Sequence, residues 1–209
     1  IRASVMKQIL KNIFFERKLE FLIRGYFYKI FKVTCRGRLQ VGRKVRIRAR
    51  LIDSNGHLRI GSYTKIQGYI NSIKLGEYIT FGEYNTILTD FSHDSFLKIG
   101  DRFSCGDYVL FGSAGGITIG NDVIFGQNIR LHAQNHNFMD TSKLIREQGT
   151  TEKGISIGNN CWVGSGTVFL DGVTVGSGCV IGANSVVTKS IPNNSVVAGS
   201  PAKIIKKRD

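Results

Sequence analysis

The chain places a hydrophobic residue at the first position of nearly every block of six residues along most of its length. From Ile157 the blocks read IGNNCW, VGSGTV, FLDGVT, VGSGCV, IGANSV and VTKSIP. Gly usually takes the second position, and the fifth is usually small or β-branched. The same period recurs from positions 75, 99 and 119, and more faintly from positions 41 and 60. A period of six fits neither an α-helix nor a single alternating strand.

This repeat predicts short strands joined by turns. Three six-residue units close a triangular coil of about 18 residues, and stacked coils form a parallel β-helix. The opening aliphatic residues are expected to point inward, and Gly at the second position permits a tight corner. We therefore predict an all-β fold, with a β-helix domain over residues 39–209 that ends in a short C-terminal tail.

The repeat also places the cysteines. Cys105 falls on an inward opening position, and Cys161 and Cys179 fall on the small fifth position. These three thiols are predicted to be buried and chemically inert. With Cys35 they form no CxxC pair and no metal-ligand spacing. Because the chain also shows no secretory signal and no apolar run of membrane-spanning length, we expect a reduced, cytoplasmic setting.

The repeat is interrupted twice. About six extra residues lie at 93–98, and the twenty residues 137–156 separate LHAQNH from the next block. A long polar loop inside a regular solenoid usually carries function, so the candidate site is placed at the second interruption. His132 and His136 precede it. Their spacing of four would suit a metal pair on a helix, but this segment is predicted to be β-helical.

The N-terminal segment follows a different pattern. In residues 4–31 apolar residues lie three and four apart, which predicts one broken or two short amphipathic helices. We assign residues 1–38 to this segment. Residues 1–50 carry 15 Lys or Arg and two Glu, so nearly all of the chain's net charge of +14 lies in this part.

Two roles stay open for this basic segment. It is an interfacial helix that associates peripherally with the inner face of an anionic cytoplasmic membrane, a cap over the open end of the coil, or both. The aromatic residues interleaved with its cations argue against nucleic acid as the partner.

The hexapeptide blocks, the NHNF tetrapeptide and the terminal VVAGSPAKIIKK resemble the hexapeptide-repeat acetyltransferases. They are most similar to the bacterial O-acetyltransferases of surface polysaccharides and to the maltose and galactoside acetyltransferases. The resemblance covers residues 41–207. It implies a left-handed parallel β-helix, a homotrimer with active sites in grooves between subunits, acetyl-CoA as co-substrate without a metal, and a glycan acceptor.

In this family a single histidine at the start of the long loop is the general base, and His136 matches it. A sugar hydroxyl is a poor nucleophile, and an imidazole with a pKa near neutrality can take its proton as it attacks the thioester carbonyl. Such a base typically contributes about 10²–10⁴-fold, and no acyl-enzyme is required. For His132, a corner residue and an outer wall of the groove both stay open.

The resemblance also implies a cofactor side and, less specifically, an acceptor side. The cofactor positions are Trp162, Ser165, Ala183, Thr188, Lys189, Lys203 and Lys206. The acceptor candidates are Asp107, Ser113, His132 and Arg146. Simple packing stays open for Trp162, a solvated tail for Lys206 and loop anchoring for Arg146. Gly106 stands where the family would have Asn, which weakens the acceptor match.

The leading hypothesis is therefore an acetyl-CoA-dependent O-acetyltransferase acting on a surface polysaccharide or a lipid-linked glycan unit. An N-acetyltransferase of a nucleotide amino sugar or another small acceptor fits the same residues. A zinc lyase of the carbonic anhydrase type would need three histidines across subunits, for which His93, His132 and His136 are the candidates. The cofactor-side residues argue against that lyase. A non-catalytic scaffold is the remaining alternative.

Overall fold

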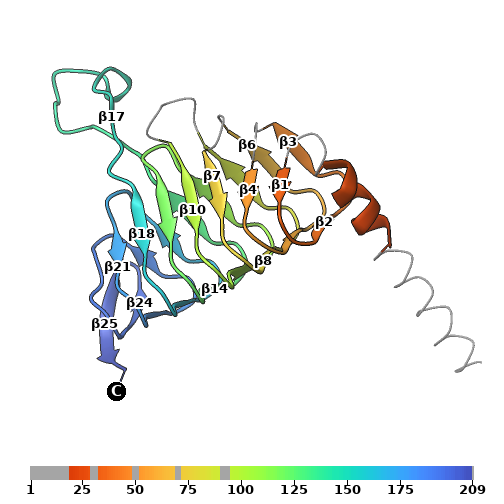
Figure 1. The fold of residues 1–209 in the computed structure, drawn as a ribbon. Coiled ribbons are helices and arrows are strands. Elements are labelled where there is room, and N and C mark those ends of the chain that lie inside the picture. The colour runs from red at the N-terminus through yellow and green to blue at the C-terminus, as the bar shows by residue number, and fades with distance from the viewer. Residues whose placement is uncertain (1–18, 29–32, 49–51, 69–71, 90–94, 209) are drawn as a thin grey trace, which may run out of the picture.

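The computed structural model describes residues 19–28, 33–48, 52–68, 72–89 and 95–208 of the 209-residue chain. Figure 1 shows a column of stacked coils, with a helix at its N-terminal end and one long loop standing out from its side. The parallel β-helix of hexapeptide repeats expected from the sequence is thereby confirmed.

Three sheets form the faces of the column, and a typical coil adds one strand to each. The first sheet runs in the order β1 (Val33–Cys35), β4 (Ile52–Ser54), β7 (Ile73–Leu75), β10 (Leu97–Ile99), β13 (Ile117–Ile119), β18 (Ile155–Ile157) and β21 (Thr174–Val175). The second runs in the order β2 (Leu39–Val41), β5 (Leu58–Ile60), β8 (Ile79–Phe81), β11 (Ser104–Cys105), β14 (Ile124–Phe125), β19 (Trp162–Val163), β22 (Val180–Ile181), β24 (Ser195–Gly199) and β25 (Ala202–Lys207). The third runs in the order β3 (Arg46–Arg48), β6 (Lys65–Gln67), β9 (Thr86–Leu88), β12 (Leu110–Gly112), β15 (Arg130–His132), β20 (Val168–Phe169) and β23 (Val186–Val187).

The hexapeptide period produces this fold because it returns an apolar side chain to the inside of every strand. Like residues then stack between coils, as where Leu97 pairs with Ile73 on one side and Ile117 on the other. Part of the interior is filled by a cluster of aromatic rings, whose neighbouring centroids lie 5.2 to 6.4 Å apart: Phe81, Phe103, Phe111 and Phe125. Such tilted and offset contacts add to the burial of apolar area.

All four cysteines are buried, as the repeat predicts for Cys105, Cys161 and Cys179. Burial raises the pKa of the Cys105 thiol to about 12, so the thiolate is scarce at neutral pH. Burial also raises the pKa of Cys161. Because the thiolate is the reactive form, these side chains are core residues.

Two boundaries differ from those expected from the sequence, and the C-terminal tail forms a strand. Strand β1 already pairs with β4, so residues 33–38 belong to the solenoid and not to the N-terminal segment. Strand β18 includes residues 155 and 156, so the 137–156 loop ends two residues earlier than expected. The C-terminal tail folds back as β25, which pairs antiparallel with β24 and covers the edge of the second sheet. Parallel strand pairing from the neighbouring coil is the physical cause in the first two cases.

The N-terminal segment is helical over residues 19–28, and its remaining predicted helical residues lie outside the described part of the chain. The helix covers the first coil. The Tyr28 hydroxyl donates to the carbonyl of Val45 at 2.8 Å, and Arg24 Nε donates to the carbonyl of Val41 at 3.2 Å. Gly25 is buried against Leu39, where any Cβ would collide with a carbonyl oxygen.

The capping role considered for the N-terminal segment is therefore observed for residues 19–28. No helix among the described residues is long and apolar enough to cross a membrane.

Candidate functional site

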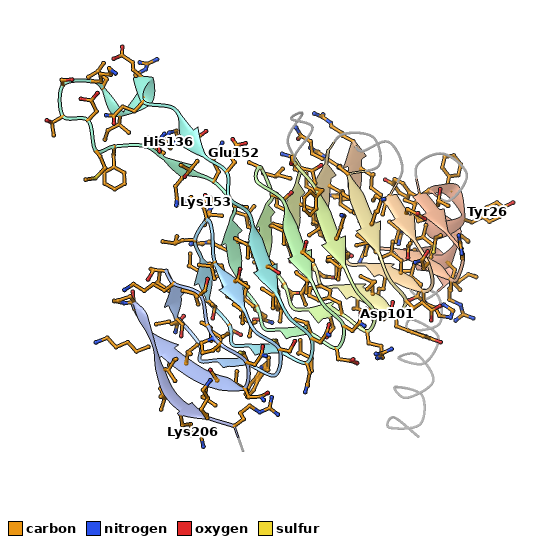
Figure 2. All side chains as sticks on the ribbon, turned by 60° about the vertical axis from the view of Figure 1, so that its left-hand side comes forward. Tyr26, Asp101, His136, Glu152, Lys153 and Lys206 are labelled. Carbon is orange, nitrogen blue, oxygen red and sulfur yellow. The ribbon has the colours of Figure 1, made fainter. Side chains whose placement is uncertain are left out.

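The chain leaves the solenoid after β15 and forms an arm, which we define as residues 134–153. The arm begins with β16 (Asn135–His136), which pairs antiparallel with β17 (Thr150–Thr151). His136 lies opposite Thr150 in this pair. Figure 2 shows His136 on the arm, away from the stacked coils. The short 3-10 helix η1 (Ile145–Glu147) lies in the second half of the loop between the two strands.

One side chain holds the outer part of the arm together. Gln148 Nε2 donates to the carbonyls of Asp140 at 2.8 Å and Lys143 at 3.1 Å, and its Oε1 accepts the Asp140 N–H at 3.0 Å. The Gln148 carbonyl in turn accepts from Asn137 Nδ2 at 3.0 Å. The Ser142 hydroxyl, which donates to Asp140, holds the pKa of that carboxyl below its usual range. These bonds give a solvent-exposed loop a defined shape.

The base of the arm is fastened to the next coil by Asp171. Its carboxylate accepts the N–H of Lys153 at 2.9 and 3.0 Å and the N–H of Gly154 at 2.8 Å. Gln134 Nε2 donates to Glu152 Oε1 at 2.6 Å and closes the neck of the arm. Because Gly154 is buried and packs against the backbone of Gly115, the point where the arm rejoins the solenoid is fixed on two sides.

Two hollows lie near the two histidines, one for each. The first, of about 310 Å³, is lined by residues that include Leu88, Gly112, Ser113 and His132. It exists because Gly112 is aligned between Leu88 and His132 on the outer face of the third sheet and leaves a gap there. The Ser113 hydroxyl donates to the carbonyl of Leu88 at 2.9 Å.

The second hollow, of about 530 Å³, lies within the arm. His136 lines it together with residues on both sides of the loop, among them Phe138, Met139 and Thr151. Phe138 and Met139 are exposed by 62% and 82%. The structure therefore separates His132 and His136, which belong to different hollows.

The other two acceptor candidates lie elsewhere. Asp107 lies in the turn between β11 and β12, where its carboxylate accepts the N–H of Glu83 at 2.7 Å. That turn is at a different corner from Ser113. Arg146 is exposed in η1, on the outer part of the arm. Of the four candidates, only Ser113 and His132 share a hollow.

The cofactor-side candidates extend along the C-terminal coils. All are solvent-exposed: Trp162, Ser165, Ala183, Thr188, Lys189, Lys203 and Lys206. Trp162 is 57% exposed in the second sheet, between Ile124 and Val180 of the neighbouring coils. The Ser165 hydroxyl accepts the N–H of Gln127 at 3.1 Å and so already has a structural partner. Figure 2 shows Lys206 well away from His136.

The described residues contain no group of three or more His, Cys, Asp or Glu side chains arranged to hold a metal ion. His93, the third histidine of the zinc alternative, lies outside the described residues.

Sequence reasoning did not identify three residues that shape this site: Gly112, Gln148 and Asp171. Gly112 could have been noticed in the sequence, because it is a Gly at a strand position whose side chain would point outward. Asp171 stands in the irregular block FLDGVT, where the repeat lacks its usual second Gly. Gln148 gives no signal in the sequence, because its role depends on the folded shape of the arm.

Comparison with known proteins identifies related sequences. Residues 154–189 match the family described as bacterial transferase hexapeptide (six repeats). The chain is 36% identical over 140 residues to the putative lipopolysaccharide biosynthesis O-acetyl transferase WbbJ of Escherichia coli K12, covering 62% of this chain and 71% of WbbJ.

Two solved structures show the same architecture. A maltose O-acetyltransferase from Clostridium difficile 630 superimposes with a TM-score of 0.56 at 30% identity, covering 63% of this chain and 67% of that protein. A hexapeptide-repeat acetyltransferase from Vibrio cholerae, crystallised with acetyl-CoA, has a TM-score of 0.52 at 28% identity and covers 63% and 66%.

Proposed function

Because the chain belongs to the hexapeptide-repeat acetyltransferases, we propose that it transfers the acetyl group of acetyl-CoA to a hydroxyl of a saccharide. WbbJ and the Clostridium difficile protein, which the chain resembles along most of the solenoid, are both named O-acetyltransferases. The Vibrio cholerae protein carries acetyl-CoA. The observation that carries the proposal is the exposed His136 at the root of an arm that Asp171 fastens to the next coil.

In the proposed reaction, His136 acts as general base. Its imidazole accepts the proton of the sugar hydroxyl while the hydroxyl oxygen attacks the thioester carbonyl. The tetrahedral intermediate then collapses with cleavage of the C–S bond, and the imidazolium returns the proton to the leaving CoA thiolate. No protein nucleophile takes part, which agrees with four buried cysteines.

The body of the acceptor is proposed to occupy the hollow lined by Ser113 and His132, with its reacting hydroxyl extended past Gln134 toward His136 on the arm. Gly112 leaves space there for a ring, and polar groups at the edge of the hollow can orient its hydroxyls. The acceptor roles of Asp107 and Arg146 are proposed more narrowly, for parts of a longer glycan that lie beyond this hollow.

The cofactor is proposed to lie along the C-terminal coils. Trp162, Ala183 and Thr188 would line the pantetheine, with the ammonium groups of Lys203 and Lys206 near the phosphates. An exposed Trp and two exposed Lys on one side of a solenoid suit a ligand with an apolar arm and a charged nucleotide.

The separation of the cofactor side from His136 within one chain supports a homotrimer in which neighbouring subunits complete each site. The arm exposes four large apolar side chains, which suit a protein contact: Phe138, Met139, Leu144 and Ile145. A mass measurement in solution that gives a monomer at micromolar concentration would remove the shared-site arrangement. The proposed setting for this enzyme is the cytoplasm, where acetyl-CoA is made.

The proposal is tested by incubating the protein with acetyl-CoA and a panel of glycans, with an amino sugar nucleotide as the alternative acceptor. The expected product is an ester that mild alkali removes, whereas an amide would survive alkali. Transfer to the amine alone would replace the O-acetyltransferase by an N-acetyltransferase. An acetyl adduct on the protein in the absence of acceptor would contradict direct attack.

A further inference from the structure

The capping helix presents an apolar face to solvent. Leu19 and Ile23 lie one helical turn apart and are exposed by 48% and 61%, and Tyr26 beside them is exposed by 70%. The opposite face, with Gly25 and Tyr28, packs on the first coil. A helix on the surface of a soluble domain normally turns polar side chains to solvent, whereas this helix also exposes large apolar ones. Figure 2 shows Tyr26 at the outer end of the solenoid.

The coils under this helix are strongly cationic. The described residues from 19 to 68 include nine Lys or Arg and only two carboxylates, those of Glu20 and Asp53. The cations are Arg24, Arg36, Arg38, Arg43, Lys44, Arg46, Arg48, Arg59 and Lys65. Among the described residues, Arg24 is the only one of these nine that pairs with a carboxylate, that of Glu20. Within the described segments, the other eight cations are solvent-exposed and form no ion pair with a carboxylate, although Lys44 Nζ lies 5.4 Å from the centre of the Tyr63 ring.

Part of the charge gathers around a hollow that spans the first three coils. The hollow has a volume of about 320 Å³, and its lining includes Arg38, His57, Arg59 and Tyr78. His57 Nδ1 accepts the N–H of Arg38 at 3.0 Å, which leaves its Nε2 as the donor of the neutral ring. Two guanidinium groups and an imidazole N–H are suited to the oxygens of a phosphate.

We propose that the N-terminal end of the solenoid docks on a membrane surface that carries anionic phospholipids. Leu19, Ile23 and Tyr26 enter the boundary between headgroups and acyl chains, and the surrounding cations, Arg38 and Arg59 among them, bind the phosphates. Apolar side chains beside uncompensated cations are the combination that holds a helix in the plane of an interface. A nucleic acid would use the cations but not the three apolar side chains.

Docking in this way would also place the site at a defined height. Strands β3, β6, β9, β12 and β15 are successive neighbours, so His132 lies four strand steps from the first coil, or about 19 Å at about 4.8 Å a step. A saccharide that extends from a lipid in the same membrane would reach the acceptor hollow. This consequence rests on the proposed function, whereas docking does not.

The test is co-sedimentation of the full chain with vesicles, in the absence of acetyl-CoA and acceptor. At 0.15 M salt we expect binding to vesicles of phosphatidylcholine with phosphatidylglycerol, and at least tenfold weaker binding to phosphatidylcholine alone. The double variant Arg38→Gln/Arg59→Gln should bind about 25-fold more weakly, because each cation near an anionic surface changes the partition coefficient about fivefold. Leu19→Gln/Ile23→Gln should lose at least tenfold.

A matched control comes from the other end of the molecule. Ile205 is 64% exposed on β25, so Ile205→Gln removes a similar apolar side chain and should leave vesicle binding unchanged. Equal binding to neutral and anionic vesicles, or no loss in either double variant, would overturn the proposal. Tight binding of duplex DNA that Leu19→Gln/Ile23→Gln does not weaken, without vesicle binding, would assign this end to nucleic acid. Since vesicle binding is measured without substrates, its failure leaves acetyl transfer untouched.

Discussion

Asp171→Ala is expected to loosen the arm while leaving the solenoid folded. The Asp171 carboxylate is half-buried and holds the N–H groups of Lys153 and Gly154 at 2.8 to 3.0 Å. Hydrogen bonds to a charged group contribute about 1.5–3 kcal/mol each. Because water can reach this site and replace part of that interaction, we take the lower figure, about 1.5 kcal/mol, for the whole loss. The equilibrium between a fastened and a detached arm then shifts about tenfold.

Limited trypsin digestion measures this shift directly. Gly154 is buried, so cleavage of the Lys153–Gly154 bond requires the base of the arm to open. The rate of that cleavage should rise about tenfold in Asp171→Ala, in the regime where cleavage follows the population of the open form. Acetyl transfer should fall at least tenfold, because a misplacement of about 1 Å in a catalytic group can cost about 10²-fold.

Two controls separate fastening from charge. Asp171→Asn keeps one oxygen acceptor and should lie between wild type and Asp171→Ala. Asp122→Ala removes a carboxylate of the same size from an exposed pair with Arg102 at another corner, and should change neither rate, since such pairs contribute little. If cleavage after Lys153 and acetyl transfer were both unchanged in Asp171→Ala, the arm would not depend on this anchor.

Two further predictions concern the hollow and the core. In initial-rate assays, Gly112→Leu should raise the KM for the acceptor at least tenfold and leave the KM for acetyl-CoA unchanged. A Cβ at this position meets only the carbonyl of Leu131 at 3.2 Å, and the longer Leu side chain fills the hollow. An unchanged acceptor KM would place the acceptor elsewhere. For Cys105, whose pKa of about 12 lies above the ordinary 9.0, the unfolded thiol ionises first as pH rises, so the free energy of unfolding should fall from about pH 9 upward by at most about 1.4 kcal/mol per pH unit. Denaturant titrations at several pH values give the free energy of unfolding, and in Cys105→Ala this contribution to its fall above pH 9 should be absent. The same pH dependence of the unfolding free energy in the two proteins would contradict it.

The fold could be predicted because every coil repeats the same pattern of buried apolar residues. Each six-residue block must return one apolar side chain to the interior, so the period is visible in the sequence. The first strand was not predicted because VTCRGR has Thr at the second position, where later blocks usually have Gly. This strand, β1, is specified by pairing with β4, which is a contact between residues 19 positions apart.

The site was only partly predictable for a related reason. The sequence marks where the coil is interrupted, and that places His136 on the arm. It does not reveal that Asp171 lies against Lys153, because that contact depends on the stacking of one coil on the next. The position of Asp107 in the repeat also does not show that its carboxylate accepts the N–H of Glu83 in the corresponding turn of the preceding coil. The roles of the cofactor-side residues stay predictions.

The most direct test of the proposed mechanism is the kcat/KM for acetyl transfer by His136→Ala beside His132→Ala. Removal of the general base should lower kcat/KM by about 10²–10⁴-fold. His136 is exposed, so the substitution should not disturb the fold, and thermal unfolding serves as the check. His132→Ala should have a smaller effect that acts through the acceptor KM. A His136→Ala enzyme within tenfold of wild type would contradict the assignment of His136 as the base.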